Sequence, residues 1–320
     1  MSILIGRDHE LKTLEKALHA AGGGIGCCIL LTGEAGIGKS RLIEELRHKA
    51  TSEKFTILQG DCFEQTLSFP YAPWIDALRA SITSLNATEI KEFLGPLATE
   101  FMKILPELAL LIPQIQPSPP LEPQAEKYRL FESFTRLGTS LSTSNPVLLI
   151  LEDLHWGDAL SLELVHYLVR RLQQQPFMLI GTYRSEESSP HLLRLLSDLH
   201  RERLVQQIGL KPLHRDDIEQ MARTLWKTQY RILASFADAL KAITDGNPYF
   251  VEEILKDLTE EGHIDELLQQ KTLEELHVPR SIQRMVQQRV EQLPETTRKI
   301  LIYASAIGQR FDFGLLQETT

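Results

Sequence analysis

The chain has 320 residues, of which 42% are hydrophobic and 24% charged, and its formal net charge is −9. This composition is that of an ordinary globular protein, long enough to form two or three cores. The acidic balance and the lack of a basic run argue against nucleic-acid binding within these residues, because phosphate neutralisation supplies most non-specific affinity.

Targeting signals are also missing from the sequence. No run of eighteen apolar residues occurs, and the N-terminal MSILIGRDHE lacks a basic start followed by a long apolar core. We therefore expect a cytoplasmic protein without a membrane span or secretory signal. Cys27, Cys28 and Cys62 lack metal-ligand spacing and are expected to be reduced thiols. The chain ends at LLQETT without a natural stop, so we expect a longer protein.

Alternating helical and strand patterns follow along the first two thirds of the chain. Apolar residues at helical spacing predict a helix over 8–21, and the segment after the glycine-rich run, 40–50, predicts another. Buried strands are predicted in 25–33, 55–63, 146–153 and 176–187. Strands separated by helical segments predict right-handed crossovers and a mainly parallel sheet covered on both faces, which is an α/β fold.

An insertion and a helical region complete the predicted organisation. Residues 62–145 form a proline-containing but mostly helical insertion between the second and third strands, because a loop of that length needs its own structure. From about 211 the patterns are amphipathic helices without a convincing strand. We predict an α/β domain over 1–210, a helical domain over 211–277, and a further region over 278–320.

The glycine-rich run GEAGIGKS fits the pattern G-x-x-x-x-G-K-[ST] and lies between a predicted strand and a predicted helix. Glycines let successive N–H groups point into one concavity, and the helix adds its positive dipole end. The lysine can reach the β/γ oxygens of a nucleotide, and the serine hydroxyl can ligate Mg²⁺. We predict a nucleoside triphosphate site formed by Gly33, Glu34, Ala35, Gly36, Ile37, Gly38, Lys39 and Ser40.

Two acids follow the apolar run of the third predicted strand. Because side chains alternate faces along a strand, Glu152 and Asp153 are expected to have different roles. By position, Glu152 would hold Mg²⁺ and Asp153 would orient the attacking water, although the two roles could be exchanged. Arg184, after the fourth strand, is a candidate sensor of the γ-phosphate. His155 is read as a structural hydrogen-bonding residue.

These motifs together resemble the STAND-type ATPases of the AAA+ superfamily. In particular, they resemble the ATPase module of large bacterial LuxR-type transcriptional regulators, which is also fused to adenylate cyclases and protein kinases. The glycine run continues into Arg41 as in that group, and GNPYFVEEIL is similar to its lid motif. Glu152 stands where many relatives carry Asp. The similar segments are 4–18, 33–46, 60–78, 148–158, 179–187, 246–255 and 278–312.

The resemblance implies a P-loop NTPase sheet with flanking helices, then a helical lid and the start of a winged-helix region. It places Gly6 and Arg7 near the adenine opening and packs Pro248 against the base, although Pro248 also reads as a helix-breaking turn. ATP or ADP with Mg²⁺ would be bound, with possible self-association and with other domains of a longer chain as partners. No arginine finger is assigned, and Arg170 and Arg171 are read as solvated residues.

Three functional hypotheses remain open from the sequence. The first is an ATP-binding, slowly hydrolysing switch, the ATPase module of a signal-transducing, transcriptional regulator, as the resemblance implies. The second is a small-molecule phosphotransferase that uses the insertion as its acceptor site. The third is a non-hydrolysing scaffold that nucleotide stabilises. The apolar helical pattern of the insertion is better suited to packing than to an acceptor site, which disfavours the second hypothesis.

Overall fold

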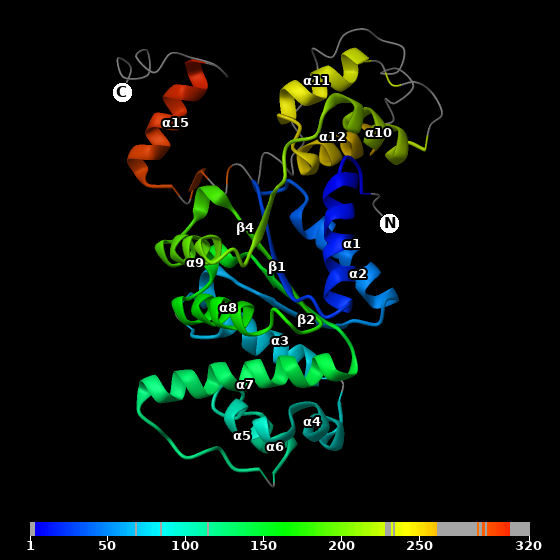
Figure 1. Cartoon of the computed structure of the whole chain (residues 1–320). Helices are drawn as coiled ribbons and strands as arrows, with labels where there is room; N and C mark the ends of the chain where they lie inside the picture. Colours follow the sequence, from blue (N-terminus) through cyan, green and yellow to red (C-terminus); the bar gives the residue numbers. More distant parts are fainter. Residues whose placement is uncertain are drawn as a thin grey trace. The chain divides into compact units, whose positions relative to one another are not determined.

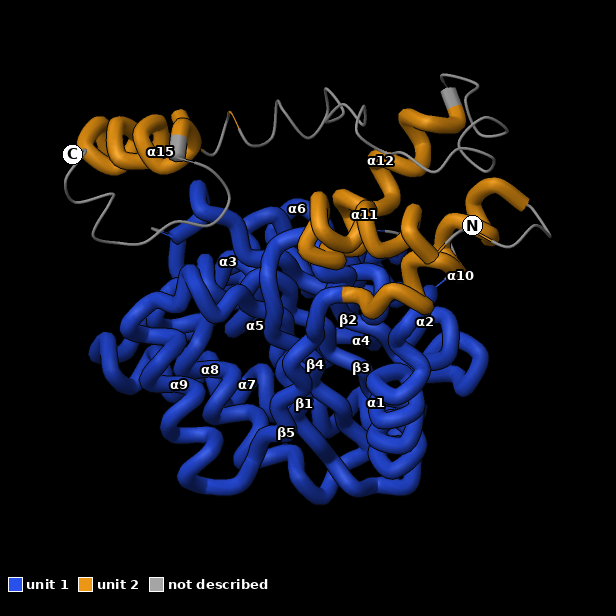
Figure 2. Tube along the Cα trace, turned by 90° about the horizontal axis from the view of Figure 1, so that it is seen from above, with its two compact units in different colours: residues 1–212 blue, residues 213–320 orange. Residues whose placement is uncertain are grey.

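The computed structural model describes residues 4–67, 69–83, 85–113, 115–227, 232, 234–260, 287, 290–291 and 293–307. The chain divides into two compact units, residues 1–212 and 213–320 (Figure 2). Each unit has its own hydrophobic core and is described by itself.

The first unit is built on a five-stranded sheet of order β2-β3-β4-β1-β5, in which every pair of neighbours is parallel. All carboxyl ends of the strands therefore lie at one edge, where ligands bind in open α/β sheets. Four strands are apolar, as the sequence predicts. The strands are β1 (Cys27–Thr32), β2 (Thr56–Asp61), β3 (Val147–Glu152), β4 (Phe177–Tyr183) and β5 (Gln206–Gly209).

The fifth strand is one that the sequence did not predict. It is short and polar, with Gln206 and Gln207 exposed, and it pairs only with β1 at the edge of the sheet. An edge strand buries little, so it lacks the apolar run that identifies the central strands.

Helices cover both faces of the sheet (Figure 1). On one face, Leu14 and Leu42 from the helices α1 and α2 pack against Ile29 and Ile180 of the strands. On the other face, Trp74 and Leu164 belong to the larger core. The covering helices are α1 (Asp8–Gly22), α2 (Lys39–Ser52), α3 (Ala72–Ile82), α7 (Pro123–Ser144), α8 (Ala159–Arg171) and α9 (Pro190–Arg201).

The segment between β2 and β3 is helical, as the sequence predicts. Asn86 caps its helix by accepting from the N–H of Glu89, and the Glu89 carboxylate accepts from the N–H of Asn86. Phe101 is fully buried and its ring lies edge-on to Phe134, with centroids 5.0 Å apart. Apolar burial of this kind is why the segment is not a long loop. Its short elements are η1 (Glu64–Thr66), α4 (Ala87–Leu94), η2 (Gly95–Leu97), α5 (Ala98–Phe101) and α6 (Leu108–Leu111).

The second unit is helical in its described residues. The helices α10 (Arg215–Leu225), α11 (Ala234–Thr244) and α12 (Pro248–Glu260) enclose a small core that includes Phe236, Leu240 and Leu255. A further helix, α15, spans Glu295–Ile307. Much of the predicted winged-helix region, 278–320, lies outside the described residues. Across the described part of the chain, no helix is both long and apolar enough to cross a membrane.

Candidate functional site

The glycine run connects the end of β1 to the start of α2 at the carboxyl edge of the sheet. Gly33, Gly36 and Gly38 have φ angles of 150°, 78° and 100°, a region that L-residues with side chains rarely adopt. A Cβ on Gly33 would lie 3.0 Å from Ile37 Cγ2 and 3.1 Å from the Leu210 carbonyl oxygen. Only glycine fits at this position without displacing its neighbours. The first turn of α2 then presents N–H groups that lack helical acceptors, which is a favourable setting for an anion.

Lys39 begins α2 and its side chain is largely buried. Its ammonium nitrogen donates to the carbonyl oxygens of Gly33 at 2.7 Å and Glu34 at 2.9 Å. Burial lowers the pKa of Lys39, and the nearby positive charge of Arg184 lowers it further. The lysine therefore lies against the glycine loop, where its ammonium group also feels the positive charge of Arg184.

Ser40 and Glu152 meet across the sheet edge. The Ser40 hydroxyl donates to Glu152 Oε2 at 2.6 Å, and Gln59 Nε2 lies 3.4 Å from Glu152 Oε1. Burial raises the pKa of Glu152, the Ser40 hydrogen bond opposes that shift, and the charges of Asp61 and Asp153 add to it. A hydroxyl and a carboxylate in contact are oxygen donors of the type that Mg²⁺ binds, so these residues fit the ion.

Asp61 and Gln59 were missed by the sequence analysis. Asp61 ends β2 and pairs in register with Glu152 on β3, which brings two carboxylates to one edge. The signal was weak, because Gln59 and Gly60 separate Asp61 from the apolar residues of β2, whereas Glu152 directly follows an apolar run. Within the described residues, no group of three or more His, Cys, Asp or Glu side chains could hold a metal. Phosphate oxygens and water would therefore complete the shell of an ion bound by Ser40 and Glu152.

Asp153 leaves the strand with a left-handed backbone, φ 55° and ψ 44°. Its N–H donates to the hydroxyl of Thr182 at 2.8 Å, and Thr182 is buried on the neighbouring strand β4. Asp tolerates this conformation better than most residues, and such strain often occurs at functional sites. Unlike Glu152, Asp153 has no hydrogen bond to Ser40. The two acids thus lie in different surroundings, as expected from the sequence.

Arg184 follows β4 and begins the short helix η4 (Ser185–Glu187). Its Nη1 donates to Glu187 Oε1 at 2.7 Å. His155, in η3 (Leu154–Trp156), lies between Glu187 and Asp153: its Nε2 is 3.4 Å from Glu187 Oε2 and its Nδ1 is 3.8 Å from Asp153 Oδ1. The sequence analysis did not single out Glu187, because it is one of two glutamates in an exposed turn.

Gly6 and Arg7 precede α1, and Gly6 has a φ of 67°. The buried guanidinium of Arg7 donates from Nη2 to the Ile37 carbonyl oxygen at 3.1 Å and to that of Lys211 at 2.7 Å. Arg7 therefore contacts the glycine loop itself. Arg41, by contrast, pairs with Glu45 at 3.4 Å one turn further along α2. The predicted place of Gly6 and Arg7 beside adenine stays a prediction.

Pro248 is the first residue of α12 and belongs to the second unit. It follows a turn in which Asp245 and Gly246 have φ angles of 52° and 74°. The Asn247 side chain accepts from the N–H of Tyr249 at 3.1 Å and so caps the helix. A proline at this position suits a helix start. Its contact with a nucleotide base stays a prediction.

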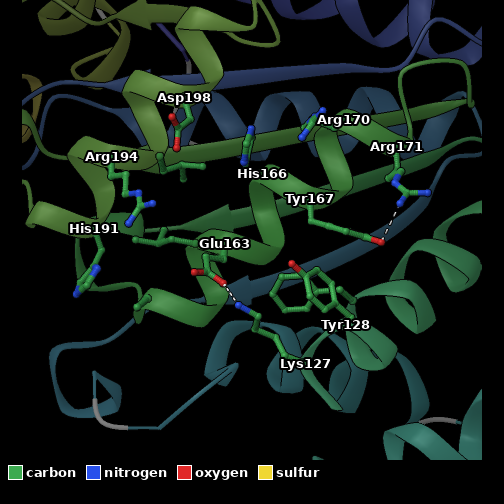
Figure 3. A pocket seen from close by; sticks show the side chains of 14 residues that line it. Lys127, Tyr128, Glu163, His166, Tyr167, Arg170, Arg171, His191, Arg194 and Asp198 are labelled. Atoms are coloured by element: carbon green, nitrogen blue, oxygen red, sulfur yellow. Dashed lines mark hydrogen bonds and ion pairs between the residues drawn. The ribbon is translucent and has the colours of Figure 1, made fainter. Parts of the chain in front are cut away.

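A cavity of about 560 Å³ lies between α7, α8 and α9, and no residue of the glycine run lines it (Figure 3). Several of its basic side chains have partners of their own. Arg170 pairs with Glu202 at 3.0 Å, and Arg171 donates to the Tyr167 hydroxyl at 3.1 Å. Both arginines are exposed, in agreement with their reading as solvated residues.

Comparison with known proteins identifies the family. A family model described as "AAA ATPase domain" matches residues 3–180. The uncharacterized protein R02095 of Rhizobium meliloti (strain 1021) is 23% identical over 328 residues, covering 98% of this chain and 30% of that protein. The chain thus spans about 30% of the length of this relative.

One solved structure supports the fold. The Walker-type ATPase PABY2304 of Pyrococcus abyssi matches with a TM-score of 0.56 at 16% identity, covering 98% of this chain and 88% of that one. A STAND protein with a tetratricopeptide repeat sensor, PH0952 from Pyrococcus horikoshii, has a TM-score of 0.41 at 14% identity, covering 99% and 37%. Because the family match covers more than half of the sequence, the chain belongs to the AAA ATPase domain family.

Proposed function

We propose that this chain binds Mg²⁺ and ATP at the glycine run and hydrolyses the nucleotide slowly. The observation that carries the proposal is the 2.6 Å hydrogen bond between Ser40 and Glu152, next to a loop that already surrounds the Lys39 ammonium. A hydroxyl, a carboxylate and a lysine arranged at the start of a helix are the parts that a P-loop uses to hold a magnesium–triphosphate complex.

Each residue has a separate role in this proposal. Ser40 and Glu152 hold the magnesium ion, which when bound would neutralise charge on the β- and γ-phosphates. Lys39 turns from the loop carbonyls to the phosphate oxygens. Asp153, which does not share the hydrogen bond between Ser40 and Glu152, orients the attacking water. Arg184, which pairs with Glu187, detects the γ-phosphate. The approach of adenine to Gly6 and Arg7 belongs to the same proposal.

The slow ATPase would act as a switch. A nucleotide shifts an equilibrium only through different affinities for the two states, so the proposal requires that ATP and ADP be distinguished. Arg184 is suited to that task because it is held by a single acidic side chain that an anionic phosphate can replace. By resemblance, the chain would serve within a signal-transducing regulator of the LuxR type, with nucleotide-dependent self-association and contacts to other domains.

A second candidate is a non-hydrolysing scaffold, and the environment of Glu152 favours it. Burial and the charges of neighbouring carboxylates raise the pKa of this acid, which disfavours its ionised form and thus metal binding. Nucleotide would then stabilise the fold without being turned over.

Nucleotide binding and turnover of two variants separate the candidates. We expect Lys39→Ala to weaken ATP binding at least about tenfold, and Asp153→Asn to bind ATP normally but lose about a hundredfold in turnover. Lys49→Ala on the same helix and Asp198→Asn on α9 are matched controls that should behave as wild type. Absent turnover with an ATP-raised melting temperature would instead favour the scaffold, and unchanged ATP affinity in Lys39→Ala would contradict both.

A further inference from the structure

His155 is a buried imidazole without a hydrogen bond. Its side chain is 0% exposed, and neither ring nitrogen has a hydrogen-bond partner. The nearest ionisable groups are Glu187, 3.4 Å from Nε2, and Asp153, 3.8 Å from Nδ1. Buried polar atoms in native proteins are nearly always satisfied, so a ring that faces two carboxylates at 3.4 and 3.8 Å without a hydrogen bond needs an explanation.

The ring is fixed in place by its neighbours. Its centroid lies 5.1 Å from that of Trp156, and the adjacent Leu154 is buried in the main core. Leu154 also packs so closely on β4 that a Cβ added to Gly181 would lie 2.6 Å from its Cδ1. The turn that carries His155 is therefore anchored to the sheet. A change in the contacts of the His155 ring must therefore come from movement of the two carboxylates or from a change in which ring nitrogen carries the proton.

A neutral imidazole has one N–H group, whereas an ionised carboxylate only accepts hydrogen bonds. Burial lowers the pKa of His155 and so favours its neutral form. The ring can then donate to Glu187 through Nε2 or to Asp153 through Nδ1, but not to both. The two acids compete for a single proton donor, and the shorter distance favours Glu187 in this structure.

The two competing acids belong to the two halves of the proposed ATPase site. Glu187 accepts from the candidate sensor Arg184 at 2.7 Å, and Asp153 is the candidate water-orienting acid. The Glu187 side chain is 35% exposed, so it can move into water once its arginine leaves. Arg184, Glu187, His155 and Asp153 thus form one continuous series of neighbouring groups.

We propose that His155 is a positioning residue that couples Arg184 to Asp153, an inference that rests on the proposed ATPase function. While Glu187 holds Arg184, it is also the nearer acceptor for the single N–H of the imidazole, 3.4 Å from Nε2. When the γ-phosphate attracts Arg184, the released Glu187 carboxylate takes the Nε2 proton and passes it to water, and Nδ1 takes up a proton from water by way of Asp153. The ring stays neutral and now donates through Nδ1 to Asp153; both acids are partly exposed, at 35% and 41%, and so reach water. The Asp153 carboxylate is thus held in the orientation that directs the attacking water only when a triphosphate is bound.

The tautomer of His155 tests the coupling without any nucleotide. In ¹⁵N-histidine spectra of the full chain, we expect the Nε2–H form of His155 in the wild type and the Nδ1–H form in Glu187→Ala. His166 on α8, whose Nε2 lies 3.2 Å from Glu202 Oε1, is the control ring, and its tautomer should be the same in both proteins. The same His155 tautomer in both proteins would overturn the proposal, whether or not the chain hydrolyses ATP.

Kinetics provide a second and independent test. We expect His155→Phe to lower kcat about tenfold or more while the Kd for ATP stays within about twofold, and His155→Asn, which restores a donor near Nδ1, to recover part of the loss. Glu187→Ala should instead raise the preference for ATP over ADP about threefold or more, because Arg184 loses its competing partner.

A lower kcat in His155→Phe together with a higher ATP/ADP preference in Glu187→Ala is the signature of coupling, since a purely structural role would impair both variants alike. Glu187 lies in an exposed turn, so Glu187→Ala remains informative if His155→Phe does not fold. An unchanged ATP/ADP preference in Glu187→Ala, or a His155→Phe protein with wild-type kcat, would contradict the proposal. A wild-type protein without turnover would refute the hydrolytic part of the proposed function, and the tautomer would still decide the role of His155.

Discussion

The hydroxyl of Ser40 donates to Glu152 at 2.6 Å although the two residues are 112 positions apart in the sequence. This contact joins the first turn of α2 to the end of β3. It brings together the hydroxyl and the carboxylate that we propose as oxygen ligands of the magnesium ion.

Removing the Ser40 hydroxyl should weaken the binding of the magnesium–ATP complex but not the binding of metal-free ATP. We expect Ser40→Ala to weaken ATP binding about tenfold in magnesium and to change it little in EDTA, because only the metal-bound complex uses the serine oxygen. Calorimetric titration under both conditions measures this difference. Ser52→Ala, at the other end of α2, is the control. An equal loss with and without magnesium would contradict the assigned role of Ser40.

Gly33 should not tolerate a side chain. Gly33→Ala combines a φ of 150° with contacts of 3.0 and 3.1 Å, so we expect it to lose about 1 to 3 kcal/mol of unfolding free energy and to bind ATP poorly. Urea denaturation and nucleotide titration measure the two effects. Gly209→Ala is the matched control, since its Cβ would meet only an ordinary contact at 3.8 Å. Equal stability of the two variants would show that the loop adapts.

Arg7 should stabilise the fold through the carbonyl oxygens that it binds. We expect Arg7→Ala to cost about 2 to 3 kcal/mol of unfolding free energy, because a buried and a part-buried carbonyl oxygen lose their charged donor. Arg136→Ala, which removes an exposed pair with Glu132, should cost less than about 0.5 kcal/mol. If both substitutions have the same effect on thermal unfolding, the contact of Arg7 with the glycine loop contributes nothing.

The acid Glu152 should make stability depend on pH. Its pKa is raised by burial, so the folded state holds the proton to higher pH than the unfolded state does. The resulting stability is present below the ordinary carboxyl pKa and is lost as the pH rises through the raised value. We therefore expect Glu152→Gln to be more stable than wild type at neutral pH and similar to it at low pH. Urea denaturation across this range measures the effect, and a constant difference would contradict it.

The sequence identified the parts of the site that depend on local patterns. Apolar runs located β1 to β4, and the spacing of Gly33 to Ser40 located the strand-to-helix loop that we propose for phosphate, because each is encoded within a few consecutive residues. Glu152 and Asp153, whose roles stay predictions, were singled out for the same reason. Their different surroundings follow from the left-handed backbone at Asp153, which the residue pattern did not predict.

Relationships between distant segments could not be predicted in this way. The pairing of Asp61 with Glu152 depends on the register of two strands, and the position of His155 between two acids depends on the folding of two turns against each other. The edge strand β5 was missed because Gln206 and Gln207 carry no apolar signal. Each of these features is determined by tertiary packing rather than by local propensity.

The strand β4 lies between β1, which leads into the glycine loop, and β3, which ends in the acids. At its centre, a Cβ on Gly181 would come within 2.8 Å of Leu30 on β1 and 2.6 Å of Leu154 beside the acids. A single methyl group there would displace Leu30 and Leu154, and so shift the glycine loop relative to Glu152 and Asp153. A substitution at the centre of the sheet would thus alter the proposed nucleotide site at its edge.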